Sequence, residues 1–384
     1  MAAPLMDRYP SISDLETRAR KRMPFFAWEY LASGTGADMA VRRNADALSK
    51  ITLTPQLLKG QFEPAIATQL LGVTYAAPIG IAPIGLTGLI WPGADDALAR
   101  TAAERRIPYT MSTVSTTSPE IAGPASDGMG WFQLYPPREK DMRDSLIRRA
   151  QDAGFTTLVV TADVPARSRR ERQVKARIRV PPKIGPKMIM QSAMNPAWSM
   201  ALLRHGMPRF RTLEQYVDKA TMRKIAGFVG ASLGGTLSYE YLAEVRDLWR
   251  GPLVVKGILD PEDAERCLAH GADAVQVSNH GGRQLDGAIA AIDALPAVLE
   301  RVAHRVPVLF DSGVRSGLDV ARALAMGADF VFCGRAFLFG VAALGARGAD
   351  HAYEVLRDEL TNVMSQTGCR DLGDLPRRLS STEA

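Results

Sequence analysis

Eight short apolar runs, each followed by a helix-like stretch, constrain the fold of this 384-residue chain more than any other feature. The runs have the length of β-strands, and several of the stretches between them have the length of helices. Strand and helix that alternate eight times predict an α/β fold, a (β/α)₈ TIM barrel. The predicted strands are 78–85, 109–113, 131–135, 157–163, 252–258, 274–280, 307–313 and 330–335, and the clearest helical stretches are 95–105, 138–153, 261–270, 288–304 and 317–326.

A doubly wound open sheet is the alternative fold for such a pattern. The first turn of a Rossmann sheet carries GxGxxG, and no such motif follows the first run, which favours the barrel. We therefore expect one domain over 1–384, with an N-terminal helical extension at 1–76, the barrel at 77–340 and C-terminal helices and a tail at 341–384. Two short helices are expected within 11–32, with Ser11 or Ser13 as the cap of the first.

Polar residues stand at the carboxyl ends of the predicted strands after the first. In a parallel barrel these ends meet at one mouth, where such barrels carry their active sites. Seven polar strand ends together predict a site there rather than seven separate structural hydrogen bonds. The residues concerned are Ser112, Gln133, Tyr135, Thr161, Asp163, Lys256, His280, Asp311, Gly334 and Arg335.

Residues 277–286 read VSNHGGRQLD and follow an apolar run. The pair Gly281-Gly282 permits a sharp turn and a close approach of the backbone to a ligand. His280 can take a proton, and Arg283 can grip a carboxylate through two hydrogen bonds. The pairing predicts chemistry on a substrate that carries a carboxylate.

Lysine and arginine at three strand ends indicate an anionic ligand. Lys256 ends the apolar run Leu253-Val254-Val255, so it needs an anionic partner, which a cofactor anion would supply. After the last two strands, 311–315 read DSGVR and 333–335 read CGR. Glycine and arginine at these two positions predict a phosphate site, because barrels commonly bind phosphate there.

The insertion at 181–212, between the fourth and fifth strands, departs from the alternation. It mixes five methionines and other apolar residues with lysines and arginines. Three interpretations remain open from the residues: a lid over the mouth, a helix packed on the barrel, or a basic amphipathic anchor on a membrane surface.

Charge and cysteine content exclude other classes of function. The net charge of +6 is modest, and no aromatic platform or DNA-reading motif accompanies it, so we expect no nucleic-acid partner. Three cysteines without paired spacing indicate neither a disulfide framework nor a metal site. No run is long enough to span a bilayer, and the N-terminus lacks the features of a signal peptide, so a cytoplasmic location is expected.

The motifs resemble those of the FMN-dependent L-2-hydroxy-acid dehydrogenases and oxidases. SNHGGRQLD matches the signature of that family, and the likeness extends from about residue 24 to 369 through WEYLASG, IAPIG, WFQLY, TLVVTADV, LVVKGIL, DSGVRSG and CGRAF. IGLTGLIWP, STVS and LLRHGMP resemble the membrane-associated (S)-mandelate and L-lactate dehydrogenases within the family. The resemblance implies FMN as the cofactor.

The resemblance also implies a role for each site residue. His280 would be the base and Asp163 the carboxylate that stabilises its protonated form. Arg283, Arg170 and the Tyr30 hydroxyl would bind the substrate carboxylate, and Tyr135 the substrate hydroxyl. Lys256 would stabilise the negative charge of reduced FMN. The remaining FMN contacts would come from Ser112, Gln133, Thr161, Ser278, Asp311, Gly313, Arg315, Gly334 and Arg335.

The implied reaction converts an (S)-2-hydroxy acid, mandelate-like or lactate-like, to the 2-oxo acid, with electrons passed to a quinone or another acceptor. An oxidase that forms hydrogen peroxide is the alternative, and a non-catalytic FMN-binding barrel is a remote one. Gly85 resembles the mandelate dehydrogenase pattern and favours slow reaction with oxygen, and Val114 widens the pocket where glycolate oxidases have tryptophan. By analogy the protein would be a homotetramer, cytoplasmic or peripheral on the inner face of the cytoplasmic membrane through 181–212.

Overall fold

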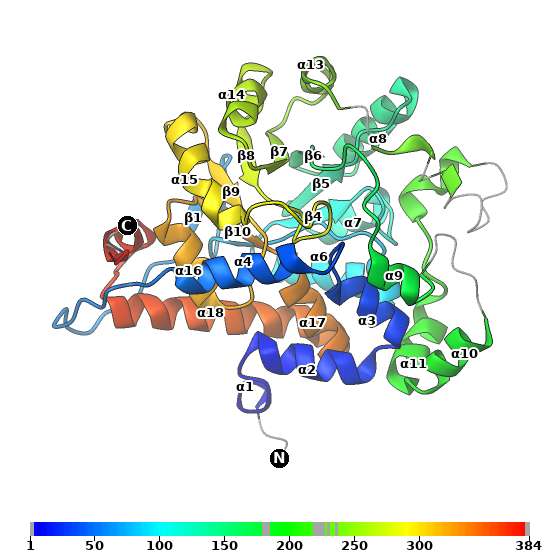
Figure 1. Cartoon of the computed structure of the whole chain (residues 1–384), viewed down its shortest axis with the longest axis horizontal. Coiled ribbons are helices and arrows are strands. Elements are labelled where there is room, and N and C mark those ends of the chain that lie inside the picture. Colours follow the sequence, from blue (N-terminus) through cyan, green and yellow to red (C-terminus); the bar gives the residue numbers. More distant parts are fainter. Residues whose placement is uncertain (1–3, 179–184, 218–226, 229–230, 235–236, 381–384) are drawn as a thin grey trace.

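A closed barrel of eight parallel strands forms the centre of the computed structural model, which describes residues 4–178, 185–217, 227–228, 231–234 and 237–380 (Figure 1). The strands follow the order β10-β3-β4-β5-β6-β7-β8-β9 around the barrel, so the predicted (β/α)₈ fold is confirmed. Most strands end before the runs that predicted them, because the residues beyond the strand ends form the loops of the mouth. The strands are β3 (Ile79–Ile81), β4 (Tyr109–Ser112), β5 (Gly130–Leu134), β6 (Thr157–Thr161), β7 (Leu253–Ile258), β8 (Ala274–Val277), β9 (Val308–Phe310) and β10 (Phe330–Cys333).

Helices follow the strands and cover the outside of the barrel. Several begin at a side-chain cap: Asp260 accepts hydrogen bonds from two amides of the first turn of α14, and Ser316 accepts one from α16. The five helical stretches expected from the sequence are all present. The helices of the barrel are α5 (Thr87–Ile90), α6 (Ala94–Arg105), α7 (Pro119–Ala125), α8 (Lys140–Asp152), α13 (Tyr239–Leu248), α14 (Pro261–Ala269), α15 (Ala291–Val302), α16 (Gly317–Ala325) and α17 (Arg335–Leu344).

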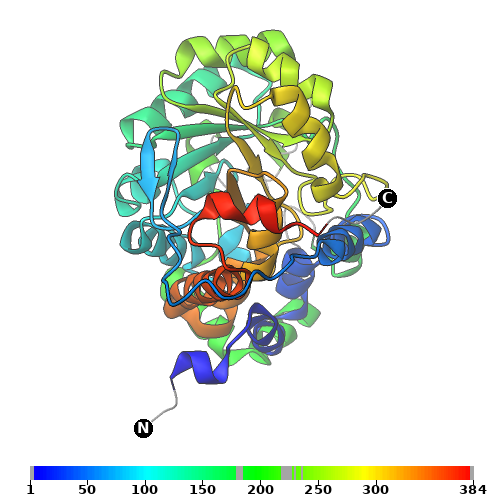
Figure 2. The ribbon, with the colours of Figure 1, turned by 90° about the vertical axis from the view of Figure 1, so that its left-hand side faces the viewer.

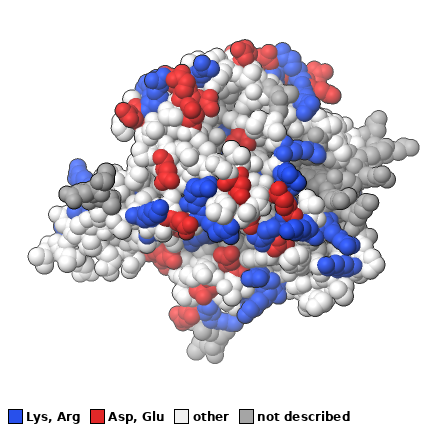
Figure 3. All heavy atoms as spheres, in the orientation of Figure 1, with Lys and Arg blue, Asp and Glu red and all other residues white. Residues whose placement is uncertain are grey.

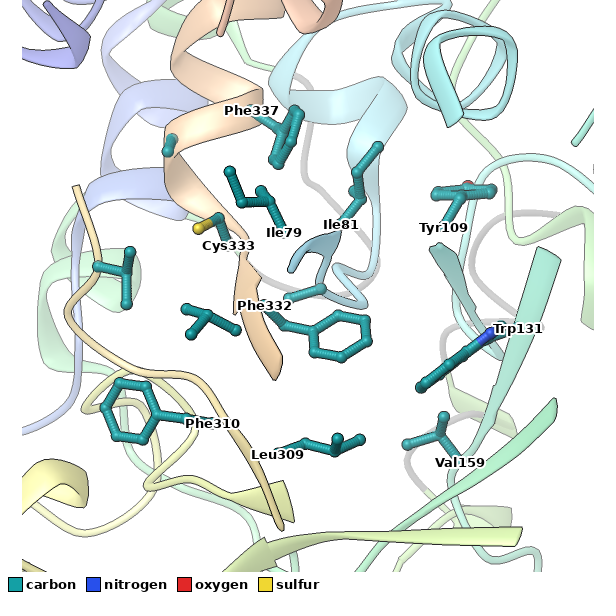
Figure 4. Packing of buried hydrophobic residues seen from close by; sticks show 14 of the residues in the cluster. Ile79, Ile81, Tyr109, Trp131, Val159, Leu309, Phe310, Phe332, Cys333 and Phe337 are labelled. Carbon is teal, nitrogen blue, oxygen red and sulfur yellow. The ribbon is translucent and has the colours of Figure 1, made fainter. Parts of the chain in front are cut away.

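Large apolar side chains fill the interior of the barrel (Figure 4). Trp131 and Phe332, from strands β5 and β10, lie 5.1 Å apart between ring centroids, and both are buried. Val159 and Leu309 lie beside them in the same view (Figure 4). Because the interior is packed, a ligand site has to lie at an end of the barrel rather than inside it.

The N-terminal segment contributes a hairpin that covers the amino ends of the barrel strands. The predicted helices of 11–32 are α2 (Ile12–Arg22) and α3 (Phe25–Ala32), and Ser11 caps α2 in a capping box with Asp14. The segment also contains α1 (Leu5–Arg8), α4 (Met39–Lys50) and an antiparallel hairpin of β1 (Thr68–Leu70) and β2 (Val73–Tyr75). Tyr75 of the hairpin accepts a hydrogen bond from Trp131 Nε1 at 3.1 Å and packs on Phe330. Both partners lie at the amino ends of their strands, so the opposite end is the open one.

The insertion after β6 contains three helices in its described part. They are α10 (Pro186–Ala193), α11 (Pro196–His205) and the 3₁₀ helix η1 (Arg211–Tyr216), while α9 (Glu171–Lys175) precedes them. Residues 181–184 of the predicted segment 181–212 lie outside the described residues. Trp198 of α11 is buried, donates to the carbonyl oxygen of Ile90 at 3.2 Å and packs edge-on against Phe26. In contrast, α10 buries none of its residues.

The chain after α17 runs along the outside of the barrel. It forms η2 (Gly345–Arg347), the long helix α18 (Gly348–Thr367) and η3 (Leu372–Arg378). Figure 2 shows α18 near α2 and the barrel helices. Within the described part of the chain, no helix combines the length and the apolar character needed to cross a bilayer.

Candidate active site

His280 lies in the turn that follows β8 and faces a cavity at the mouth of the barrel. Its backbone is left-handed, with φ 59°, and Gly281 and Gly282 continue the turn at φ 63° and 76°. The turn predicted at the glycine pair is therefore present. A non-glycine residue adopts this conformation at a cost, and such residues gather at functional sites. Ser278 holds the turn, since its Oγ accepts a hydrogen bond from His280 N at 3.0 Å.

The imidazole of His280 lies between two polar groups. Its Nδ1 is 2.9 Å from Oδ1 of Asp163, and its Nε2 is 3.2 Å from the hydroxyl of Tyr135. Burial lowers the pKa of His280 and outweighs the opposing effect of Asp163. Burial acts to raise the pKa of Asp163, but its interactions with His280 together lower it. A carboxylate beside an imidazole of lowered pKa suits a base whose protonated form needs stabilisation.

Two arginines and a tyrosine from three distant segments face the same cavity. Arg283 donates to the backbone oxygen of Tyr30 at 2.9 Å, and its guanidinium lies 5.2 Å from the centre of the Tyr30 ring. The Tyr30 hydroxyl donates to the carbonyl oxygen of Gly85 at 3.1 Å. Arg170 is held by Ser168, whose Oγ is 2.9 Å from Nε. Burial, and then repulsion from Arg170, lowers the pKa of Arg283 to about 10.

Lys256 forms a buried ion pair inside the mouth. Its Nζ lies 2.7 Å from Oδ2 of Asp311 and donates to Oγ of Ser278 at 2.6 Å. Gln276 and Ser312 also donate to Asp311, at 2.8 Å each. The anionic partner expected for Lys256 is thus Asp311 of the protein itself, whereas the sequence suggested a cofactor anion for this position.

A row of hydrogen bonds joins three neighbouring strands of the mouth. Ser112 of β4 donates to Oε1 of Gln133 on β5 at 2.8 Å, and Gln133 Nε2 donates to Thr161 of β6 at 2.9 Å. All three side chains are buried. The row gives one side of the mouth a fixed set of donors and acceptors, which suits the polar edge of a planar ring.

The residues expected to hold a phosphate line the same cavity: Gly313, Arg315, Gly334 and Arg335. Gly334 is the N-cap of α17, so the amino end of a ten-residue helix lies there. Burial lowers the pKa of both Arg315 and Arg335. The Arg335 guanidinium donates hydrogen bonds of 2.9 to 3.0 Å to three carbonyl oxygens, those of Leu31, Ser33 and Gly281.

The cavity measures about 310 Å³, within the range of small-molecule sites. Five guanidinium groups line it, and no carboxylate of the described residues lies within ion-pair distance of any of them. So many cations without acidic partners require anionic groups on whatever the cavity binds. The five are Arg167, Arg170, Arg283, Arg315 and Arg335.

Several residues that support the site were not singled out in the sequence. Asn44 of α4 exchanges hydrogen bonds with Asn279, the neighbour of His280, at 2.7 and 2.8 Å. Asp286 accepts bonds from the amides of Ala37 and Ala40 at the start of α4. These partners are more than 230 positions apart in the chain, so no local pattern could have found them. Two further lining residues, Leu233 and Gly234, come from the segment before α13.

The fold and the site together define a class of protein: a barrel enzyme that binds anionic groups beside a buried base. Comparison with known proteins places the chain within that class. The model of the FMN-dependent dehydrogenase family matches residues 19–382, and the chain belongs to this family. It is an FMN-dependent enzyme of the 2-hydroxy-acid dehydrogenase and oxidase group.

Three similar proteins illustrate the range of the family. An L-lactate dehydrogenase of Pseudomonas paraeruginosa is 38% identical over 94% of this chain and 96% of its own. The crystal structure of the monotopic membrane protein (S)-mandelate dehydrogenase has a TM-score of 0.91 and 36% identity, over 96% of this chain and 98% of that one. A mandelate oxidase structure has a TM-score of 0.81 and 32% identity, over 96% of this chain and 97% of the other.

The residues at the mouth fit FMN. The unpaired Arg315 and Arg335 and the amino end of α17 provide donors for a phosphate. The row Ser112–Gln133–Thr161 and the ammonium of Lys256 provide polar contacts for the flavin ring. Arg170, Arg283, Tyr30 and His280 also line the cavity and are not needed for these contacts.

Proposed function

We propose that this enzyme oxidises an (S)-2-hydroxy acid, mandelate-like or lactate-like, to the 2-oxo acid. The observation that carries the proposal is the position of His280, between Asp163 and Tyr135 and in one cavity with the unpaired Arg170 and Arg283. A base beside two guanidinium groups that have no carboxylate partner suits a substrate with a carboxylate next to the carbon that loses hydrogen.

Each side chain has a distinct role in this proposal. Arg170 and Arg283 bind the substrate carboxylate, with help from the Tyr30 hydroxyl. Tyr135 holds the substrate hydroxyl, and His280 removes a proton through Nε2. Asp163 accepts the Nδ1 hydrogen and stabilises the imidazolium once it forms.

FMN, when bound, would accept the two electrons and the second hydrogen that leave the substrate. Lys256 would lie against the flavin ring and stabilise negative charge there. Ser112, Gln133, Thr161 and Ser278 would bind the ring and the chain next to it, and Asp311, Gly313, Arg315, Gly334 and Arg335 would hold the remainder with the phosphate.

The pocket favours a substrate with a side chain larger than a hydrogen atom. Ile84, Gly85 and Val114 line the cavity without an aromatic ring among them. The relatives act, by their names, on lactate and on mandelate, which supports these two as the first substrates to test.

The electron acceptor is proposed to be a quinone or another non-oxygen acceptor, as in a dehydrogenase. The L-lactate and (S)-mandelate dehydrogenases among the relatives support this choice. The mandelate oxidase among the structural neighbours supports the alternative, an oxidase that reduces oxygen to hydrogen peroxide.

A visible spectrum of the purified protein tests the proposal, followed by anaerobic addition of (S)-mandelate, (S)-lactate or glycolate. Bleaching of the flavin band by one of them would support the reaction and identify the substrate. If the reduced flavin recolours slowly in air but rapidly after addition of a quinone, the result would support the dehydrogenase. If it recolours rapidly in air and forms hydrogen peroxide, the result would support the oxidase. A flavin that none of them bleaches would contradict the proposed substrates.

We also propose peripheral membrane contact through the insertion 181–212. Several of its apolar side chains are exposed, and lysine and arginine lie among them. In Figure 3 basic side chains appear on the lower right of the molecule, where α9 to α11 lie in Figure 1. The exposed apolar residues are Ile189, Met190, Met194, Met200, Leu203 and Met207. The monotopic (S)-mandelate dehydrogenase among the structural neighbours supports the proposed membrane contact.

A homotetramer is proposed separately, by analogy with the family.

A further inference from the structure

Asp95 is a buried carboxylate in the first turn of α6, outside the set of side chains that line the cavity. It is 4% exposed, and no lysine, arginine or histidine of the described residues lies within ion-pair distance of it. The amino end of α6 stabilises its negative charge. A buried carboxylate without a cation is costly unless hydrogen bonds satisfy its oxygens, so its partners are informative.

Five hydrogen bonds converge on the Asp95 carboxylate from the two loops beside it and from β4. Oδ2 accepts from the hydroxyls of Thr87 and Thr116 at 2.6 Å each and from the Thr116 amide at 3.2 Å. Oδ1 accepts from Ser115 at 2.8 Å and from the Tyr109 hydroxyl at 3.1 Å. All five partners donate to the carboxylate, whereas an amide in its place would accept at the Oδ2 position but donate to the Ser115 and Tyr109 hydroxyls, reversing those two bonds.

Four of the five donors, all except the Tyr109 hydroxyl of β4, belong to the segments that form one wall of the cavity. One half of the wall is the loop after β3, which contains Ile84 and Gly85 and leads to Thr87. The other half is the loop after β4, in which Val114 is followed by Ser115 and Thr116. The loops are also joined directly, because Gly88 N donates to Thr116 Oγ1 at 2.9 Å and Leu86 N to the Val114 oxygen at 2.9 Å. Asp95 thus lies behind the wall and links its two halves through hydrogen bonds.

The two halves of the wall are closely packed and leave no space for an added methyl group at Gly85. A Cβ atom at Gly85 would lie 2.5 Å from Cγ2 of Val114, closer than real contacts allow. The carbonyl oxygen of Gly85 accepts the hydrogen bond from the Tyr30 hydroxyl at 3.1 Å. A shift of the wall therefore moves both the space beside Val114 and the acceptor that orients Tyr30.

We propose that Asp95 is a positioning residue that sets substrate affinity and side-chain selectivity by holding the Gly85 and Val114 loops together. The proposal rests on the proposed function, because Tyr30 and Val114 act here as contacts of the 2-hydroxy acid. Asp95 itself touches neither the substrate nor the cofactor.

The test compares Asp95→Asn with Asp273→Asn, which replaces an acceptor of the Leu253 amide at the opposite end of the barrel. Steady-state rates are measured with (S)-mandelate and (S)-lactate on protein with bound FMN. We expect Asp95→Asn to raise KM about tenfold, to change kcat less and to alter the ratio of kcat/KM between the two acids. Asp273→Asn should leave KM and the ratio unchanged, even if it lowers thermal stability equally.

A second pair of variants keeps the proposal testable if Asp95→Asn does not fold. Thr116→Val removes the hydroxyl that joins Asp95 to Gly88, and Thr116→Ser retains it. The valine variant should reproduce the rise in KM and the altered ratio, and the serine variant should restore both. Wild-type KM and ratio in Thr116→Val would overturn the inference. A wild-type flavin that neither acid reduces would instead overturn the proposed function.

Discussion

Nδ1 of His280 lies 2.9 Å from Oδ1 of Asp163. An ionised carboxylate can only accept a hydrogen bond, so this contact places the hydrogen of the neutral imidazole on Nδ1. Nε2, on the opposite edge of the ring, then carries the lone pair and accepts from the Tyr135 hydroxyl at 3.2 Å. In the proposed mechanism the pair therefore makes Nε2 the nitrogen that acts as the base, and the substrate proton has to lie beside it.

Replacement of His280 should separate cofactor binding from chemistry. His280→Ala removes the base but leaves the residues proposed to bind the phosphate and the ring, so we expect bound FMN and a rate of flavin reduction lower by about 10²- to 10⁴-fold. Anaerobic stopped-flow reduction measures this rate. The matched control is His270→Ala, at the end of α14 and outside the cavity, which should react as the wild type does. A near-normal rate in His280→Ala would remove His280 from the mechanism.

The pH dependence should reflect the lowered pKa of His280. The base acts in its neutral form, so kcat/KM should fall as the pH drops through the pKa of His280 and stay level above it. Because burial lowers that pKa, the midpoint should lie below the ordinary value of 6.5. A profile of kcat/KM between about pH 4.5 and 8 measures it. A midpoint at or above 6.5 would contradict the assignment.

Asp163→Asn should change this profile in a defined direction. The carboxylate of Asp163 raises the pKa of His280 and so partly opposes burial. Its loss should move the midpoint to still lower pH and, since the imidazolium that forms in the reaction is no longer stabilised, also lower the plateau. A plateau at the wild-type level would show that Asp163 has no part in the chemistry.

The ion pair of Lys256 and Asp311 should contribute to the free energy of unfolding. Both side chains are almost fully buried, so Lys256→Met leaves an uncompensated charge and should lower the free energy of unfolding by about 3–5 kcal/mol. The double variant Lys256→Met, Asp311→Asn removes both charges and should regain most of the loss. Urea denaturation of the flavin-free protein measures these values. Equal stability of the single and double variants would mean that Asp311 is not a destabilising charge once Lys256 is replaced.

Arg283 should not tolerate replacement by lysine. Its guanidinium donates to the Tyr30 oxygen while it faces the cavity, and the single ammonium of lysine cannot make both contacts with the same geometry. We expect Arg283→Lys to raise KM for the 2-hydroxy acid at least about tenfold while FMN stays bound. Steady-state kinetics with a spectrum of the bound flavin checks both. An unchanged KM would place the substrate carboxylate elsewhere.

The barrel could be predicted from the sequence because the patterns that indicate strands and helices are local. Apolar runs of strand length and caps such as Ser11 depend on neighbouring residues, and parallel topology then brings the polar strand ends to one mouth. The contacts that support the site could not be predicted in this way, because they join residues that are not neighbours in the chain. Asn44 and Asn279 are 235 positions apart, and Asp95 and Thr116 are 21 apart. The segment 1–76 was predicted as a helical extension, so the β1–β2 hairpin within it was not foreseen. The partner of Lys256 also became evident only when β7 and β9 were placed in one barrel.

The exposed apolar side chains of the insertion should bind phospholipid. Leu203 is 86% and Met194 is 72% exposed, and Lys187 and Arg204 lie near them in the chain. A Leu side chain transferred from water to the bilayer interface contributes roughly 1.5–3 kcal/mol, so Leu203→Glu with Met194→Glu should weaken binding to anionic vesicles at least about tenfold. The matched control is Leu58→Glu, at a fully exposed leucine outside the insertion, which should bind as the wild type does. Vesicle co-sedimentation at low and high salt measures binding, and added salt should weaken it because the basic residues contribute. Wild-type protein that stays in the supernatant, or a double variant that sediments equally, would show that this surface does not bind the membrane.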